Sequence, residues 1–297
     1  MDRTRSGVLA ALTAFFLWGI LPIFWKQLQF LPAGSIVAQR TLWSLLLLIP
    51  LVGFRGDRLE LLAGLRSPRT LLWHALSGCV LASNWLLYVW ATLHGHILEG
   101  ALGYYLNPFF NMLFGTLWFG ERHNRWQFAA IGLALVGLGF QVHALKGIPR
   151  ISVTLALSFA LYAVVRKRAR LGSLSGLVLE TVILAPLALG WLMWSSPSLS
   201  AAFGNSTPHA VLVICTGLAT AVPLLCFGYA TRAIRLTTLG ILQFLGPTLQ
   251  FLIGWLVYEE PMSGVRLISF AFIWVAIAVY ALDAWRRGRA PLECGGK

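Results

Sequence analysis

One segment of the sequence carries aromatic and amide side chains at helical spacing around a proline. Tyr104, Asn107, Pro108 and Asn111 stand at i, i+3, i+4 and i+7, so they share one face if the segment is helical. Proline lacks a backbone N–H and clashes with the carbonyl four residues before it, which frees the backbone oxygen of Tyr104. A freed carbonyl needs a partner, so we expect this face to contact protein or water rather than lipid.

The same pattern recurs in the second half of the chain. Residues 102–121 align without gaps on residues 241–260. The aligned pairs include Tyr104 with Gln243, Pro108 with Pro247, Asn111 with Gln250, Gly115 with Gly254 and Glu121 with Glu260. A Pro, a Gly and a Glu shared at one offset indicate an internal duplication. We expect the two polar faces to oppose each other across a central cavity; the alternative is that amides and small residues only hold helices together.

Further polar and aromatic residues lie in neighbouring apolar segments. Asn84 and Tyr88 share a face of the segment before Tyr104, and Trp18 and Tyr162 occupy similar local sequences in the two halves. Rings with polar tips suit amphipathic solutes, so we predict that these four residues line the same cavity. The alternative is that they belong to interfacial belts or helix contacts.

Arg40 and Glu180 are ionisable residues placed well inside apolar segments, where a charge is costly enough to indicate a role. If the two halves are antiparallel, helical rise separates them by roughly 10 Å in depth, so we expect no direct salt bridge. Each is predicted to hold helices or a gate on its own side, and Glu180 is also a candidate proton site. Glu121 and Glu260 are expected at membrane faces, capping the helices that follow them.

The sequence offers little for catalysis. His94, His96 and Glu99 form a short connector that could hold a metal ion, but such a trio more often binds nothing specific, so no metal site is predicted. The motifs GxxxxGK[ST], HExxH and GxSxG are absent from the sequence. We therefore predict a protein that is not an enzyme and uses no cofactor.

These candidate residues must be positioned by helices in lipid. The chain has 297 residues, of which 58% are hydrophobic and 11% charged, and its mean hydropathy is +0.76. A soluble surface is not compatible with that composition. The apolar windows predict about ten membrane spans. They lie near residues 7–26, 34–54, 71–93, 100–119, 126–145, 151–165, 174–194, 209–230, 236–258 and 264–285.

The positive charges indicate topology. The net charge is +13, but Lys and Arg gather in short clusters between alternate apolar windows, as at residues 166–170. This pattern favours cytoplasmic loops over nucleic-acid binding and places both termini in the cytoplasm. Five spans per half then require the second half to enter the membrane with opposite orientation.

The predicted fold is therefore an all-α membrane protein of ten transmembrane helices in two inverted five-helix repeats, with repeats at residues 1–145 and 146–290 and a tail at 291–297. Inverted repeats are typical of secondary transporters, which bind solutes near the midplane at interrupted helices. We expect a small-molecule substrate, the lipid bilayer and no nucleic acid as partners. The alternatives are a non-transporting membrane sensor or assembly component and, less favoured, a membrane enzyme.

Several segments together resemble the RarD branch of the EamA family, within the drug/metabolite transporter superfamily. They are FFLWGILPIFWK at 15–26, QRTLWS at 39–44, NWLLYVWA at 84–91, GYYLNP at 103–108, SFALYAVVRK at 158–167 and GLVLET at 176–181. The resemblance implies ten helices in two inverted repeats, a bacterial inner-membrane location and transport, in a branch commonly linked to sensitivity to drugs such as chloramphenicol. That branch usually has His where this chain has Gln39, so a titrating role there does not carry over.

Overall fold

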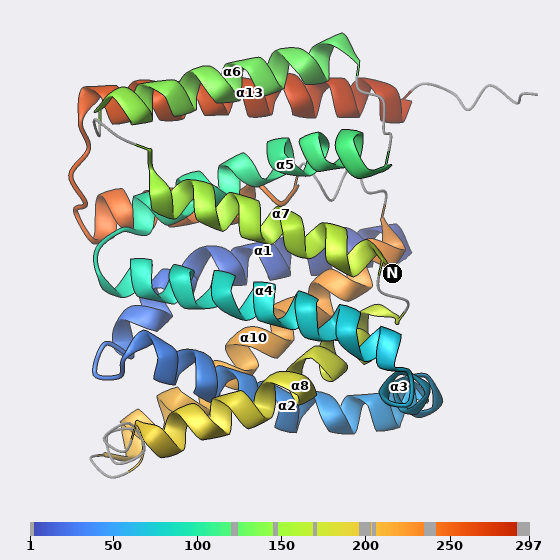
Figure 1. The fold of residues 1–297 in the computed structure, drawn as a ribbon. Helices are drawn as coiled ribbons and strands as arrows, with labels where there is room; N and C mark the ends of the chain where they lie inside the picture. Colours follow the sequence, from blue (N-terminus) through green and yellow to red (C-terminus); the bar gives the residue numbers. More distant parts are fainter. Residues whose placement is uncertain are drawn as a thin grey trace, which may run out of the picture.

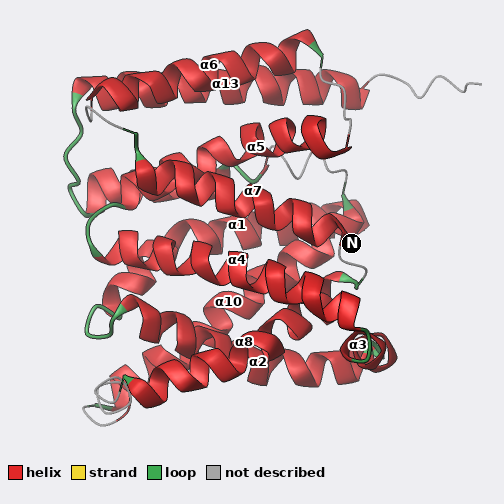
Figure 2. Ribbon diagram, in the orientation of Figure 1, coloured by secondary structure: helices red, strands yellow, loops and turns green. Residues whose placement is uncertain are grey.

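The computed structural model describes residues 3–119, 124–144, 148–168, 171–195, 203, 206–234 and 242–289, and helices are the only regular elements in these ranges (Figures 1 and 2). The helices are α1 (Arg3–Gln27), α2 (Ala33–Arg55), α3 (Arg58–Leu65), α4 (Pro68–Leu93), α5 (Ile97–Phe119), α6 (Arg125–Ala144), α7 (Arg150–Arg168), α8 (Ser173–Trp194), α10 (Thr207–Ala233), α12 (Leu245–Leu252), the π-helix η1 (Ile253–Val257) and α13 (Gly264–Arg289).

Much of this helical structure suits a bilayer. Six stretches are long and apolar enough to cross a membrane: Thr4–Gln27, Ala33–Arg55, Pro68–Leu93, Leu174–Trp194, Thr207–Phe227 and Gly264–Asp283. Two shorter apolar helices cover Arg125–Phe140 and Leu245–Val257. Long apolar side chains such as Leu72, Leu187 and Met193 are exposed on the outer surface, where lipid would cover them. The expectation of an all-helical membrane protein is confirmed, and the count of ten spans stays a prediction.

The short helix α3 was not expected from the sequence, which showed only a connector between the windows 34–54 and 71–93. It follows Gly56, whose φ of +78° suits glycine. A helix of this length is marginal alone, and contacts with the start of α8 stabilise it. The carboxylate of Glu60 accepts hydrogen bonds from the backbone N–H of Gly172 at 2.7 Å and from the hydroxyl of Ser175 at 2.5 Å.

The helices pack as neighbouring pairs drawn from the two halves of the chain. In Figure 1, α6 and α13 lie together at the top, and α2 and α8 lie together at the bottom. The pairs in between are α5 with α7, α1 with α10, α2 with α10, α4 with α7, α4 with α8, α1 with α12 and α5 with α12. Most of the packing therefore joins segments that are distant in the sequence.

Small residues let some of these helices approach closely. A Cβ atom on Gly217 of α10 would lie 2.7 Å from the backbone carbonyl carbon of Trp43 on α2. A Cβ atom on Gly103 of α5 would lie 2.9 Å from the backbone oxygen of Ser152 on α7. Such contacts are how helices associate in lipid, where apolar side chains gain little by leaving their solvent.

Candidate functional site

Arg40 is buried where α1, α2, α4 and α10 meet. Its side chain is 4% exposed. Its Nε donates a hydrogen bond of 3.0 Å to the hydroxyl of Thr220 on α10. The guanidinium carbon lies 4.1 Å from the ring centroid of Trp85 on α4 and 5.0 Å from that of Trp25 on α1. Arg40 is thus held by two indole rings and one hydroxyl.

Glu180 lies on α8, 1% exposed, and joins α8 to α4 and α7. Its Oε1 accepts a hydrogen bond of 2.6 Å from the hydroxyl of Ser77 and lies 3.3 Å from Nδ1 of His74. The same oxygen lies 3.5 Å from Nε of Arg166, and Oε2 accepts a 3.4 Å hydrogen bond from the hydroxyl of Tyr162. The carboxylate therefore has a positive partner and several donors.

Arg40 and Glu180 do not pair with each other, in agreement with the depth argument. The ion pairs in the described ranges include His74–Glu180, His96–Glu99 and Arg166–Glu180, and none of these joins Arg40 to Glu180. Each of the two buried charges instead makes its own set of contacts with side chains from other helices.

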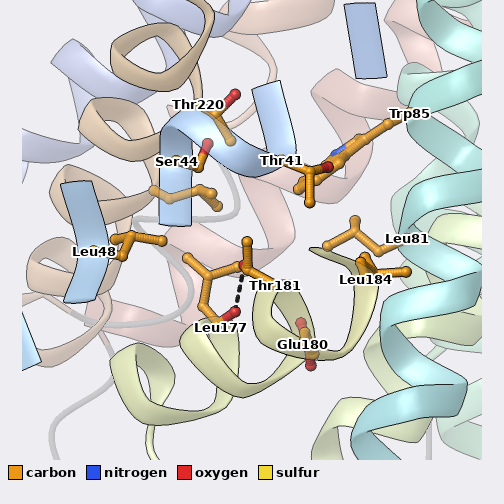
Figure 3. A pocket seen from close by; sticks show the side chains of 11 residues that line it. Thr41, Ser44, Leu48, Leu81, Trp85, Leu177, Glu180, Thr181, Leu184 and Thr220 are labelled. Atoms are coloured by element: carbon orange, nitrogen blue, oxygen red, sulfur yellow. Dashed lines mark hydrogen bonds between the residues drawn. The ribbon is translucent and has the colours of Figure 1, made fainter. Parts of the chain in front are cut away.

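A small cavity of about 10 Å³ lies between these two sets of contacts, which is close to the space that one water molecule needs. Its lining combines Thr41, Ser44, Thr181, Thr220, Glu180 and the indole of Trp85 with five leucine side chains. Figure 3 shows Thr220 and Trp85 on one side of this cavity and Glu180 on the other. Because Thr220 and Trp85 also touch Arg40, the cavity connects the surroundings of the two charges.

The predicted residues on α4 and α5 are partly brought together. Asn84 is buried, and its Nδ2 donates to the backbone oxygen of Leu155 at 3.0 Å and to the hydroxyl of Ser158 at 2.9 Å, both on α7. The rings of Tyr88 and Tyr104 meet edge to face, 5.4 Å between centroids. Asn84 therefore holds α4 to α7. This is the helix contact that the sequence left open as the alternative to lining a cavity.

The amides of the two repeated segments lie in different surroundings. Gln250 is buried on α12, and its Nε2 donates a 3.1 Å hydrogen bond to the backbone oxygen of Trp18 on α1. Asn107 is buried and Asn111 is half-buried, both on α5. Gln243 lies half-buried in the turn that precedes α12. No hydrogen-bond partner is found in the described ranges for the Oδ1 of Asn107 or the Oε1 of Gln250.

The neighbouring residue Tyr105, rather than Tyr104, reaches from α5 to α12. Its hydroxyl donates a 2.8 Å hydrogen bond to the hydroxyl of Thr248. Tyr104 instead packs on Tyr88 and on Phe159 of α7. Pro247 is buried, whereas the side chain of Pro108 lies outside the described residues. The opposition of the two polar faces across a cavity stays a prediction.

A second, larger hollow of about 550 Å³ lies between α1 and α10. Its lining is apolar apart from Gln27 and includes none of the predicted substrate-binding residues. Of those residues, Trp18 lies nearby on α1, where it packs against Phe15 and Phe227. The small cavity beside Glu180, and not this hollow, has a charged side chain and several hydroxyl-bearing side chains in its lining.

Several residues around the two charges were not singled out from the sequence. They are Trp25, His74, Ser77, Arg166 and Thr220. Arg166 was assigned only to a cytoplasmic cluster. The one available signal for these residues was a histidine inside an apolar window. His74 and Ser77 stand at i and i+3, so both lie on one face of the same helix.

Glu260, in the connector before α13, caps a helix of the other half. Its carboxylate accepts hydrogen bonds from the backbone N–H groups of Ile97 at 2.5 Å and Leu98 at 2.8 Å. These are among the first N–H groups of α5, which have no partner inside their own helix. The expectation that Glu260 caps the following helix is therefore wrong. Burial raises the pKa of Glu260, and the two N–H groups oppose that shift. Glu121 lies outside the described residues.

Comparison with known proteins places the chain in a family. Residues 5–142 match the model of the EamA-like transporter family. A protein of Pseudomonas aeruginosa named as an uncharacterized transporter is 44% identical over 95% of both chains. The protein RarD of Escherichia coli is 38% identical over 95% of this chain and 96% of its own length.

A solved crystal structure has the same overall arrangement. It matches with a TM-score of 0.64 at 22% sequence identity, and the match covers 95% of this chain and 99% of the other. That similarity concerns the fold alone. The sequence relatives carry the assignment further: the protein is a multi-pass membrane transporter and belongs to the EamA-like transporter family, among relatives named RarD.

Proposed function

We propose that the protein is a secondary transporter, a permease or exporter, of small organic solutes in a bacterial inner membrane. In this proposal, residues 1–145 and 146–290 form two inverted five-helix repeats that rock against each other and expose a central site to each side in turn. Both termini lie in the cytoplasm. The solute meets aromatic and amide side chains on the way through.

The observation that carries this proposal is the symmetry of the helix packing. The two halves are interchanged by a relabelling of their helices. It exchanges α1 with α7, α2 with α8, α4 with α10, α5 with α12 and α6 with α13. Under this exchange the pair α1–α10 becomes α7–α4, and α1–α12 becomes α7–α5. The pair α2–α10 becomes α8–α4, and α2–α8, α5–α12 and α6–α13 map onto themselves. An exchange of this kind is expected if the halves are related by a pseudo-two-fold axis.

Local geometry agrees with the exchange of α1 and α7. On α1 the rings of Phe15 and Trp18 lie 5.7 Å apart with an interplanar angle of 56°. On α7 the rings of Phe159 and Tyr162 lie 5.9 Å apart at 49°. These pairs belong to the similar sequences FFLW and FALY, so the aromatic residues recur in the repeats at equivalent places.

The small cavity beside Glu180 lies among helices that the exchange relates. Its lining comes from α2 and α8, which exchange with each other, and from α4 and α10, which do likewise. Relative motion of the halves would change the spacing of these helices. A cavity with room for about one water in this state could therefore widen to admit a solute as the halves rock.

The test is flux through purified protein in liposomes, measured by counterflow with a panel of labelled aromatic metabolites and chloramphenicol. We expect at least one solute to exchange faster than in protein-free vesicles. Asn111→Ala and Gln250→Ala should lower that flux more than they lower thermal stability, and Thr13→Ala, at an exposed site on α1, should leave it unchanged. Normal flux in both amide variants would remove the amides from the site, and absence of flux for the whole panel would favour a non-transporting membrane component.

A further inference from the structure

Arg40 and Glu180, two of the buried charges in the described residues, differ in how they are neutralised. Glu180 lies 3.5 Å from Arg166 and accepts hydrogen bonds from Ser77 and Tyr162. Arg40 is as deeply buried, but none of the acidic side chains in the described ranges lies within ion-pair distance of it. A buried cation without a counter-charge is costly in a membrane protein and indicates a function.

The contacts of Arg40 leave one part of the guanidinium unused. Trp85 and Trp25 lie against the group at 4.1 and 5.0 Å, and Nε is taken by the hydroxyl of Thr220. In the part of the chain that the structure describes, no hydrogen bond from the two Nη atoms is found. Those atoms carry four of the five N–H groups of the side chain. Two parallel N–H groups on one edge are the geometry that binds a carboxylate or phosphate.

A second unpaired donor belongs to the same cluster. The indole Nε1 of Trp25 is fully buried and has no acceptor among the described side chains and backbone. Buried N–H groups are nearly always paired in native proteins. An anion would supply acceptors for this N–H and for the Nη groups of Arg40, whereas a cationic solute would leave both unpaired.

The small cavity lies next to this cluster. Thr220 and Trp85, which contact Arg40, line it together with the hydroxyls of Thr41 and Ser44. No Lys or Arg is found in that lining. Arg166, beyond Glu180, is already matched by that carboxylate. Glu180 lines the opposite side of the cavity and would repel an anion, so an anion that enters would be held at the side of Thr220, Trp85 and Arg40.

We propose that Arg40 binds the anionic group, a carboxylate or a phosphate monoester, of a small organic solute, with Trp25 and Trp85 fixing the guanidinium. This proposal rests on the transport function and names the class of its substrate. It assigns Arg40 a direct contact with solute in place of the gating or structural role expected from the sequence.

The test is thermal unfolding of the full-length protein in detergent with four probes that share one ring: benzoate, phenyl phosphate, neutral benzamide and cationic benzylamine. At least one of the two anions should raise the unfolding temperature with saturation, because ligands stabilise the state they bind. Stabilisation by benzoate would indicate a carboxylate substrate, and stabilisation by phenyl phosphate would indicate a phosphate monoester. Benzamide and benzylamine should have no such effect. Equal stabilisation by benzamide or benzylamine, or none by either anion, overturns the proposal.

Variants test the residue itself. Arg40→Gln should raise the anion concentration needed for half-maximal stabilisation by about tenfold or more, the effect of losing a hydrogen-bonded charge. Arg125→Gln is the matched control, since the Arg125 guanidinium lies 5.4 Å from the Trp126 ring but is exposed. If Arg40→Gln does not fold, Thr220→Val, which removes the acceptor of Nε, should weaken the anion response in the same direction. An unchanged response in the variant that folds overturns the proposal.

The two proposals fail separately. Flux of neutral solutes only, with no stabilisation by either anion, would remove the anion site and leave transport standing. A saturating anion effect that needs Arg40, without flux of any solute, would remove transport and leave an anion-binding membrane protein.

Discussion

The hydroxyl of Ser77 donates a hydrogen bond of 2.6 Å to the carboxylate of Glu180, and both side chains are fully buried. This contact ties α4 to α8 across the two halves of the chain, next to His74 and Arg166. This hydrogen bond holds Glu180, which lines the small cavity. Any rocking of the halves must strain or break it.

Removing that hydroxyl should destabilise the protein. Hydrogen bonds to charged groups contribute about 1.5–3 kcal/mol, so we expect a loss of about that size for Ser77→Ala in unfolding from detergent. Ser83→Ala on the same helix is the control, because Ser83 is exposed and donates only to the backbone oxygen of Cys79. Equal effects of the two substitutions would contradict the structural role of the Ser77–Glu180 contact.

Removing the carboxylate should cost more than removing its donor. Glu180→Ala removes the carboxylate that faces Ser77, Tyr162 and Arg166, and breaking a buried ion pair typically costs about 3–5 kcal/mol. Glu180→Gln keeps acceptors for Ser77 and should cost less. Unfolding titrations of both variants would measure the difference, with the exposed Glu259→Gln as control. A loss for Glu180→Ala no larger than that for Glu259→Gln would contradict the prediction.

The pH dependence of stability should include Glu260. Its pKa is raised above the ordinary 4.5 by burial, so between the two values the folded state binds more protons than the unfolded state. Stability from this group is then present at low pH and is lost as pH rises through the raised pKa. Glu260→Gln cannot titrate and should flatten that part of the profile.

The measurement is the unfolding midpoint of both proteins across about pH 4 to 8, the range that surrounds a raised carboxyl pKa. Glu259→Gln, next to it but exposed, should keep the wild-type profile. If the stability profiles of the wild type and of Glu260→Gln run parallel, the pKa of Glu260 is not raised in the folded protein, and the prediction is wrong. At all pH values Glu260→Ala should lose about 0.5–2 kcal/mol, as expected for a lost helix cap.

The closeness of α2 and α10 should make Gly217 intolerant of a side chain. A Cβ atom there would lie 2.7 Å from the backbone of Trp43, and backbone cannot rotate away, so Gly217→Ala should cost about 1–3 kcal/mol. At Gly132 on α6 nothing lies within 4 Å of the added atom. Gly132→Ala should therefore be neutral or stabilising by up to about 1 kcal/mol. Thermal unfolding of both variants would show whether the two glycines differ in this order.

The helices themselves were largely predictable because lipid demands long apolar stretches whose backbone groups are satisfied within the segment. The windows near 34–54 and 71–93 correspond to Ala33–Arg55 and Pro68–Leu93. The helical spacing of Asn84 and Tyr88 placed both on a buried face. The connector helix α3 could not be predicted, because a helix of eight residues is marginal by itself and depends on contacts with distant segments such as α8.

The sequence by itself determined that this chain is a bundle of apolar helices, that it carries a proline and amides at repeated positions, and that Arg40 and Glu180 are buried charges. Only the tertiary structure decided which groups meet those charges, since Thr220 and Ser77 come from 180 and 103 residues away in the chain. The physical reason is that hydropathy identifies a membrane helix but not its rotation about its own axis. That rotation is set where small residues such as Gly217 let two backbones approach.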